Sequence, residues 1–226
     1  MDQIEIDKIF YRDGYSLAQR YLGQELSAVQ LGEAIRALYT AIDELLEAFL
    51  QRASAEGQPV SCKNGCAWCC HQEVFAITHE FLYLNEYVQK HLPDADRESV
   101  LERAREKVKI SMNKSLEEQL KIRSACPFLE SNSCMIYEAR PMACRIYLSA
   151  SESSCRKEHD YPSDTRSFPG LFDFPLKAGR MMNEGFVAWL KQAGLQVSEL
   201  PIEQGYSSMV SMGQSMKEWL NSTQNK

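Results

Sequence analysis

The sequence contains eight cysteines in 226 residues, and they fall into two groups. The segment SCKNGCAWCCH, residues 61–71, holds four of them within nine positions. The segment CPFLESNSCMIYEARPMACR, residues 126–145, holds three more, and the last follows soon after. Clustered thiols can form disulfides, ligate metal or supply a nucleophile. The eight positions are Cys62, Cys66, Cys69, Cys70, Cys126, Cys134, Cys144 and Cys155.

The expected compartment favours metal ligation over disulfides. The amino-terminal stretch MDQIEIDKIF carries acidic residues and no long apolar run, unlike a signal peptide. No window approaches 18 uninterrupted apolar residues, so we expect a cytoplasmic protein without a membrane span. Thiols stay reduced in the cytoplasm, where clustered cysteines more often bind metal. A single cysteine nucleophile is also disfavoured, because none of the eight thiols stands apart.

The spacing of the first four cysteines predicts a shared or a polynuclear centre. Asn64-Gly65 is a turn dipeptide that should fold Cys62 back over Cys66. From Cys66 onward the sequence predicts the start of a helix, with the next two cysteines at i+3 and i+4. Neighbouring helical residues point about 100° apart, so the adjacent pair suits two metals or two corners of one cluster. We expect the sulfurs of Cys66, Cys69 and Cys70 to face Cys126, Cys134 or Cys144.

The later cysteines are separated by seven, nine and ten residues, which suits loops wrapped around an inorganic centre. A zinc ribbon would instead show paired C-x2-C units. Eight thiolates suffice for two four-coordinate sites; alternatively, one centre takes four and the others are structural. His71 is an alternative ligand. His79 and His159 are expected at helix ends or on the surface, and His91 at a helix end.

The charge of such a centre predicts basic partners. Four thiolates around zinc, or around an oxidised 4Fe–4S cluster, leave a net charge of about −2. Arg140 and Arg145 bracket Cys144 in a proline-bearing turn, so we predict that both help to hold the cofactor. The sequence singles out no catalytic residue.

These motifs resemble the YkgJ-type cysteine-cluster family, described as a zinc- or iron-chelating domain. The family pattern C-x3-C-x2-C-C, C-P-F-L, C-x-I-Y and R-P-x-x-C-R is met in order across residues 60–156. The resemblance implies that the cysteines chelate metal. A flagellin lysine methylase carries a similar cluster, which brings iron–sulfur chemistry into consideration. The C-x3-C-x2-C spacing is also similar to that of radical S-adenosylmethionine enzymes, but the alternating strands and helices of their barrel are missing from this sequence.

The remaining sequence predicts a mainly α protein, with an irregular cysteine-rich metal-binding core wrapped by amphipathic helices. Ser27 should cap a strong helix, and Thr78 a shorter one ending before Pro93. A long helix is expected over about 96–123, and two more near 177–193 and 205–221. A helix over 1–24 should be interrupted at RDGYS. The first strong helix carries a heptad stripe made of Leu31, Ile35, Leu38, Ile42, Leu45 and Phe49.

We expect this stripe to pack within its own domain, because sustained coiled coils usually run longer. The alternative is a homodimer through this amino-terminal helix. The chain divides into an amino-terminal helical region (1–57), a cysteine-cluster metal-binding region (58–160) and a carboxy-terminal helical region (161–226), expected to form one compact domain. The net charge of −6 disfavours a nucleic-acid or anionic-membrane partner.

The leading hypothesis is a metal-binding protein that chelates iron, as an iron–sulfur cluster, or zinc through its eight cysteines. Iron is preferred, because the adjacent pair and the long loops suit a polynuclear centre. Two alternatives stay open: an iron–sulfur enzyme that modifies a protein side chain, similar to a methylase, and a helical module that binds a protein partner and contains a structural zinc. The sequence thus leaves open whether the protein is an enzyme.

Overall fold

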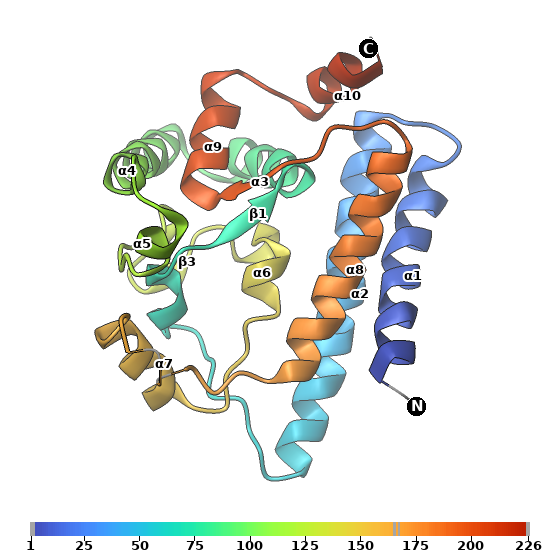
Figure 1. The fold of residues 1–226 in the computed structure, drawn as a ribbon. Helices are drawn as coiled ribbons and strands as arrows, with labels where there is room; N and C mark the ends of the chain where they lie inside the picture. The colour runs from blue at the N-terminus through green and yellow to red at the C-terminus, as the bar shows by residue number, and fades with distance from the viewer. Residues whose placement is uncertain (1–2, 165, 167, 225–226) are drawn as a thin grey trace.

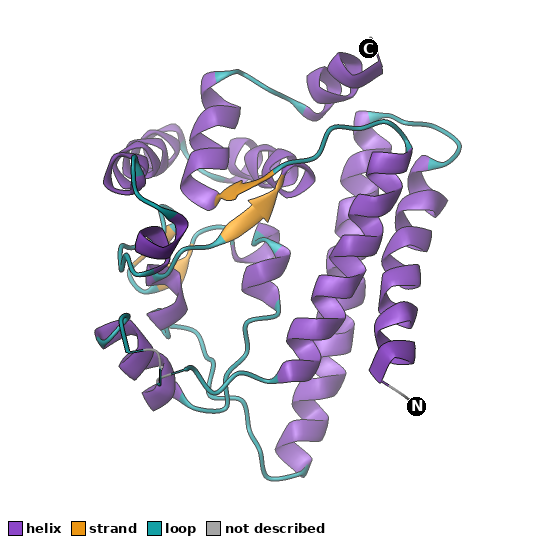
Figure 2. Ribbon diagram, viewed as in Figure 1, coloured by secondary structure: helices purple, strands orange, loops and turns teal. Residues whose placement is uncertain are grey.

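A computed structural model describes residues 3–164, 166 and 168–224. Within these residues the chain forms ten α-helices, two 3-10 helices and four short strands, so the mainly α prediction is confirmed. Figures 1 and 2 show the long helices α1, α2 and α8 side by side, next to a second group that contains α3, α4 and α9. The loops of the cysteine region run below and between these two groups, together with the short helices α6 (Met142–Arg145) and α7 (Glu152–Asp160).

The helix α1 (Gln3–Leu22) runs without interruption through RDGYS, where we expected a break. It packs against α8 (Asp173–Gln192), and two glycines lie at the contact. A Cβ atom on Gly14 would collide with the backbone of Met182, and one on Gly185 with the backbone of Tyr11. Gly14 therefore serves close helix packing, and the predicted interruption was wrong.

The helix α2 (Ala28–Ala55) begins at the predicted cap, where the Ser27 hydroxyl accepts a hydrogen bond from the Gln30 N–H at 3.3 Å. Its apolar stripe faces the interior of the same chain, in agreement with the favoured interpretation. The first four stripe residues are completely buried: Leu31, Ile35, Leu38 and Ile42. The homodimer through this helix stays a prediction.

The helix α3 (Thr78–His91) ends before Pro93 as expected, but Thr78 is not its cap. Ile77 occupies the cap position, and its N–H donates to the Glu80 carboxylate at 2.9 Å. The Thr78 hydroxyl is hydrogen bonded to Ser198 instead. This contact continues the antiparallel pairing of β1 (Phe75–Ile77) with β4 (Glu199–Pro201). A small sheet thus joins α3 to α9 (Ile202–Ser211).

The prediction of one long helix over 96–123 is wrong, because two helices occupy this range. α4 (Asp94–Ser111) ends, Asn113 adopts a φ of +65°, and α5 (Leu116–Leu120) begins behind a new cap. Ser115 and Glu118 form that cap by reciprocal hydrogen bonds. The expected apolar stripe turns outward after the break, as Leu116 is 58% exposed.

The helix predicted over 205–221 is also divided. α9 ends at Ser211, Gly213 adopts a φ of +61°, and α10 (Met216–Gln224) follows. The Ser215 N–H donates to Glu218, and the Glu218 N–H donates to Ser215. Both missed breaks therefore combine a left-handed residue with an S-x-x-E capping box.

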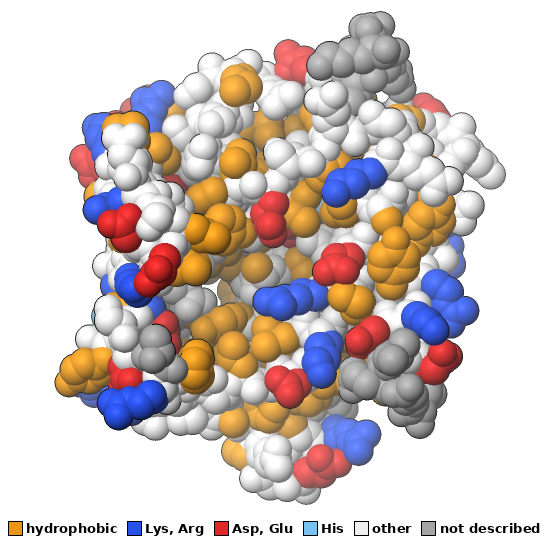
Figure 3. Space-filling view, in the orientation of Figure 1, with side chains coloured by type: hydrophobic (Ala, Val, Ile, Leu, Met, Phe, Trp, Pro, Cys, Tyr) orange, Lys and Arg blue, Asp and Glu red, His pale blue; other side chains and the backbone are white. Residues whose placement is uncertain are grey.

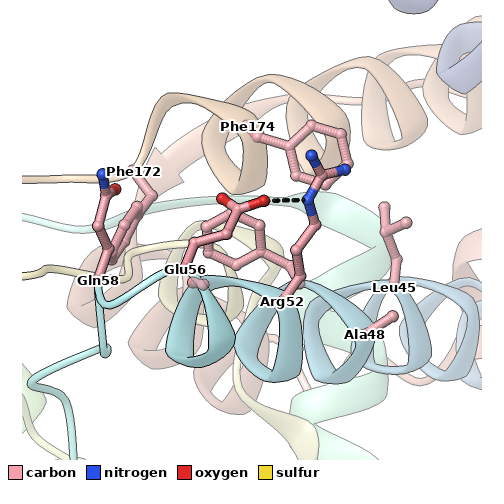
Figure 4. Close-up of a pocket in the computed structure, with 9 residues that line it drawn as sticks. Leu45, Ala48, Arg52, Glu56, Gln58, Phe172 and Phe174 are labelled. Carbon is pink, nitrogen blue, oxygen red and sulfur yellow. Dashed lines mark hydrogen bonds and ion pairs between the residues drawn. The ribbon is translucent and has the colours of Figure 1, made fainter.

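One continuous apolar core joins the three sequence regions, with contributions from α1 and α2, from α3 and α4, and from α8, α9 and α10. Acidic and basic side chains are interspersed over the face in Figure 3. A pocket of about 420 Å³ lies between α2 and the start of α8, and aromatic rings line it (Figure 4). Its rim carries the ion pair of Arg52 with Glu56, at 2.8 Å. Within the described chain, each helix is too short or too polar to cross a membrane.

Candidate metal centre

The first cysteine segment is held in place by backbone contacts from residues 149 and 150. The Ser61 N–H donates to the Ser149 carbonyl at 2.8 Å, and its hydroxyl donates to the Ala150 carbonyl at 2.8 Å. The Ser149 N–H in turn donates to the Cys62 sulfur at 3.3 Å. A backbone N–H directed at a sulfur favours the thiolate form, which is the form that binds metal.

The expected turn at Asn64-Gly65 is present, and it is followed by a shorter helix than predicted. Gly65 adopts a φ of +85°, and the Cys66 N–H donates to the Lys63 carbonyl at 3.0 Å. The helix is the 3-10 helix η1 (Trp68–His71), which leaves Cys66 outside it. The i+3 and i+4 geometry of one α-helix was therefore wrong for these three cysteines.

The second segment runs alongside η1. The Cys126 N–H donates to the Cys70 carbonyl at 2.7 Å, and the Ser124 N–H donates to the His71 carbonyl at 3.0 Å. A hairpin follows, formed by β2 (Leu129–Glu130) and β3 (Ser133–Cys134). Its turn residues Ser131 and Asn132 have positive φ, as a tight hairpin requires. This hairpin places Cys134 close in space to the loop of Cys126.

The last two cysteines lie on short helices. After the 3-10 helix η2 (Tyr137–Ala139), α6 (Met142–Arg145) carries Cys144. α7 (Glu152–Asp160) carries Cys155 and contacts η1. The contact includes the Trp68 indole N–H, which donates to the Glu152 carboxylate at 3.4 Å.

The charges of the thiols influence one another across two groups. Burial raises the pKa of Cys62, and the negative charges of Cys69, Cys66 and Cys155 raise it further. We call the three thiols Cys62, Cys66 and Cys155 the outer trio. Burial likewise raises the pKa of Cys144, as do the charges of Cys126, Cys134 and Cys69. The thiols Cys126, Cys134 and Cys144 form the inner trio.

The adjacent pair lies between these trios. The pKa of Cys69 is raised chiefly by a hydrogen bond with Cys70, and also by burial and the charge of its neighbour. The charge of Cys69 acts on both the outer and the inner trio. These interactions therefore link all eight predicted cysteines, with Cys69 in contact with both trios through its charge and with Cys70 through a hydrogen bond.

Backbone N–H groups oppose the effect of burial at several sulfurs. Backbone hydrogen bonds from Trp68, Phe128 and Ile136 lower the pKa values of three cysteines. These are Cys66, Cys126 and Cys134, respectively. Burial is the larger effect, and it raises the pKa of Cys126 to about 12. These thiols are consequently protonated at neutral pH without a metal, and metal binding would release their protons.

The two predicted arginines share one acidic partner, Asp43 of α2. The buried Arg145 forms an ion pair with Asp43 and donates to the carbonyls of Glu138 and Arg140. Arg140 approaches Asp43 at 3.7 Å and also lowers the pKa of Cys134 by its charge. Both arginines thus fix the turn that carries Cys144. Their contact with a bound cofactor stays a prediction.

Sequence reasoning missed a buried carboxylate that positions α6. Glu80 accepts hydrogen bonds from the Met142 N–H at 2.6 Å, the Ile77 N–H at 2.9 Å and the Tyr39 hydroxyl at 3.2 Å. Burial raises the pKa of Glu80. Its position as the third helical residue after Ile77, typical of a capping carboxylate, was the available signal.

A buried lysine with two carboxylates lies near the inner trio and was also missed. Lys107 of α4 is 3.2 Å from a Glu203 oxygen and 3.9 Å from a Glu73 oxygen. Burial, together with the neighbouring Glu203 carboxyl group, raises the pKa of Glu73 to about 8. Lys107 follows Val100 and Ala104 on the buried face of α4, a spacing that could have identified it.

The histidines divide into two kinds. His79 is completely buried in the first turn of α3 and bonds to Asn183 at 3.2 Å, so it is no surface residue. His91 ends α3 as expected. His71 and His159 lie beside the cysteines, with ring centroids 5.3 Å apart.

The donor set fits a thiophilic metal, because thiolates select zinc, copper(I) and iron–sulfur clusters. Among the described residues, no three His, Cys, Asp or Glu side chains are already spaced to hold an ion. A metal would therefore have to draw the thiols together as they lose their protons.

Residues 61–163 match a family model described as "CxxCxxCC: Putative zinc- or iron-chelating domain". The match confirms the resemblance found in the cysteine motifs and covers the segments of all eight cysteines. Neither the curated proteins nor the solved structures contain a significant match to the chain.

Proposed function

Because residues 61–163 form a domain of the CxxCxxCC zinc- or iron-chelating family, we propose that this metal-binding chain holds iron, as iron–sulfur clusters, on its eight cysteines. The observation that supports this proposal is the adjacent pair Cys69-Cys70 between two trios of thiols. Each trio lacks one thiolate of a four-thiolate site, and the pair supplies one to each. The result is two centres with four thiolates apiece.

The surroundings of the sulfurs support the same assignment. Iron–sulfur centres depend on hydrogen bonds to their sulfurs and on nearby charge. Backbone N–H groups reach Cys62, Cys66, Cys126 and Cys134, and Arg140 brings a positive charge to Cys134. An iron–sulfur cluster would supply electron transfer or structural stability, while these residues would orient and neutralise it.

Metal analysis on anaerobically purified protein tests the identity of the metal. We expect iron and inorganic sulfide in equal amounts, a brown colour and little zinc. Zinc near two equivalents per chain with no sulfide would overturn the iron assignment and leave a zinc-binding protein.

Single substitutions test the division into two centres. If each trio serves its own centre, Cys155→Ser and Cys126→Ser should each lose about half of the iron, and the double variant nearly all of it. If all the iron is lost in each single variant, the eight cysteines serve one centre. Tyr147→Phe is a matched control, since the Tyr147 hydroxyl lies near Cys69 and Cys155 but donates its hydrogen bond to Gln72, at 3.2 Å.

A further inference from the structure

Two histidines from different segments meet beside the outer trio. His71 is the last residue of η1, and His159 lies one residue before the end of α7. Their ring centroids are 5.3 Å apart with an angle of 83° between the planes. The Trp68 ring lies 5.3 Å from that of His159 and packs against it at an angle of 62°. Packing of α7 on η1 thus brings together two of the four histidines of the chain.

The hydrogen bonds of both rings leave the same nitrogen available. Nδ1 of His71 is 2.9 Å from the Ala67 carbonyl, and Nδ1 of His159 is 3.0 Å from the Asp160 carboxylate. A carbonyl or a carboxylate can only accept, so Nδ1 carries the hydrogen in both rings. In the neutral rings Nε2 then carries the lone pair. Within the described residues no hydrogen bond occupies either Nε2.

We propose that His71 and His159 form an open binding site for one divalent transition-metal ion, separate from the thiolates. Metal-ligating histidines typically donate their other N–H to a carbonyl or a carboxylate, as these two do. Two imidazoles on one tetrahedral ion, with Zn–N bonds of about 2.0–2.1 Å, have ring centroids about 5.2 Å apart. The observed centroid separation of 5.3 Å is close to this value, so the two rings can share an ion once both Nε2 atoms turn toward it.

The two imidazole ligands determine which metal ions the site can bind. Imidazole suits zinc, copper and nickel, whereas magnesium and calcium require oxygen ligands. No third His, Cys, Asp or Glu side chain of the described chain converges with the two rings, so water would complete the coordination. Asp160 also forms an ion pair with Arg156, with 3.5 Å between the charged atoms, and this pair helps to fix the carboxylate that contacts His159.

Equilibrium dialysis against zinc chloride tests the site on protein that keeps its own cysteine-bound metal. We expect one additional zinc ion per chain, beyond the metal present before dialysis. His71→Asn and His159→Asn should each lose this ion, with at least a tenfold weaker affinity. His91→Asn is the matched control, because its Nδ1 also contacts the carbonyl four residues earlier, at 2.9 Å, and its ring also stacks on an aromatic residue.

The imidazole nitrogens provide a second measurement. In long-range proton–nitrogen spectra, zinc should shift Nε2 of His71 and His159 together and leave His91 unchanged. The proposal is overturned if wild type binds no additional zinc, if His91→Asn loses the ion as well, or if His71→Asn keeps it. The iron and sulfide of the His71→Asn variant are measured in parallel, so a failure here is distinct from a failure of the cysteine centres.

Discussion

The helices α1, α2 and α8 and the cysteine region are built on different physical principles. The three helices bury long apolar stripes and approach so closely that two contacts require glycine. In the cysteine region, taken here as the two cysteine-bearing segments 61–71 and 126–145, the regular elements are short, η1 having four residues and α6 four. Its order depends on individual hydrogen bonds and on the ion pairs of Asp43. From this comparison we predict that the helices fold by hydrophobic burial, whereas the cysteine region depends on its metal.

Metal removal should separate the two regions most strongly. A structural metal site contributes on the order of 10 kcal/mol in small metal-binding domains, so a chelator should unfold the cysteine region. Limited proteolysis should then cut between Pro59 and Arg156, while α1, α2 and α8 resist. Circular dichroism should still show most of the helical signal. Equal protection of residues 59–156 with and without metal would remove the proposed difference.

Arg145→Met should be the most destabilising single change outside the cysteines. It removes the buried cation that joins α2 to the turn before Cys144 and leaves Asp43 and two carbonyls without this donor. Each buried acceptor that is left without its donor costs about 1–3 kcal/mol, whereas the partly exposed Asp43 can be hydrated. Urea unfolding of the metal-loaded protein measures this loss of stability. Arg156→Met, at a side chain that is 67% exposed, is the control and should change stability by less than about 0.5 kcal/mol.

Two glycine substitutions should change the free energy of unfolding of the protein in opposite directions. Gly14→Ala forces a methyl group into the backbone of α8 and should cost about 1–3 kcal/mol. Gly32→Ala places the same group where the nearest atom is 3.9 Å away, and its better helix propensity should add about 0.5–1 kcal/mol. Thermal melts measure the melting temperature of each variant against that of the wild type. A stabilising Gly14→Ala would contradict the close contact between α1 and α8.

The pH dependence should give an effect comparable in size to that of Gly14→Ala. The folded pKa of Glu73 is raised from 4.5 to about 8, so the folded state binds the proton more tightly and stability falls as pH rises from about 4.5 to 8. The folded pKa of His79 is lowered from 6.5 to about 3, since burial opposes its charge, and stability falls as pH drops from about 6.5 to 3. The two effects predict a maximum between about pH 4.5 and 6.5.

Glu73→Gln should flatten the alkaline side of this profile, by roughly 1–3 kcal/mol between pH 6 and 8. Urea unfolding of the variant and the wild type at each pH measures the difference, in which the pH dependence of metal binding cancels. An unchanged alkaline slope in the variant would show that Glu73 is not the titrating group.

Local sequence signals predicted the helices well where nothing distant competed with them. Ser27 as a cap, the end of α3 before Pro93 and the buried stripe of α2 follow from residues close in sequence. The breaks after Ser111 and Ser211 were missed, although an S-x-x-E capping box follows each of them. Those boxes lie inside continuous amphipathic patterns, which predict an unbroken helix more strongly than a single capping box predicts a break.

Contacts between segments that are far apart in the chain could not be predicted from the sequence. Gly14 looked like a helix breaker, because the backbone of Met182 that it contacts is 168 residues away. The cysteines themselves were recognisable from their types and spacing. Their division into two trios depends on the packing of α7 against η1 and on the hairpin that carries Cys134, which no local pattern encodes.

Alkylation of the cysteines tests most directly whether they hold the metal. Anaerobic protein is treated with iodoacetamide before and after chelation, and peptide mass spectrometry reports modification at each cysteine. We predict that all eight are protected in the metal-loaded protein and become modified together after chelation. Cys62, which is exposed, is the most informative position. If it and the other thiols react equally fast with and without metal, the cysteines do not hold the metal, and the account is contradicted.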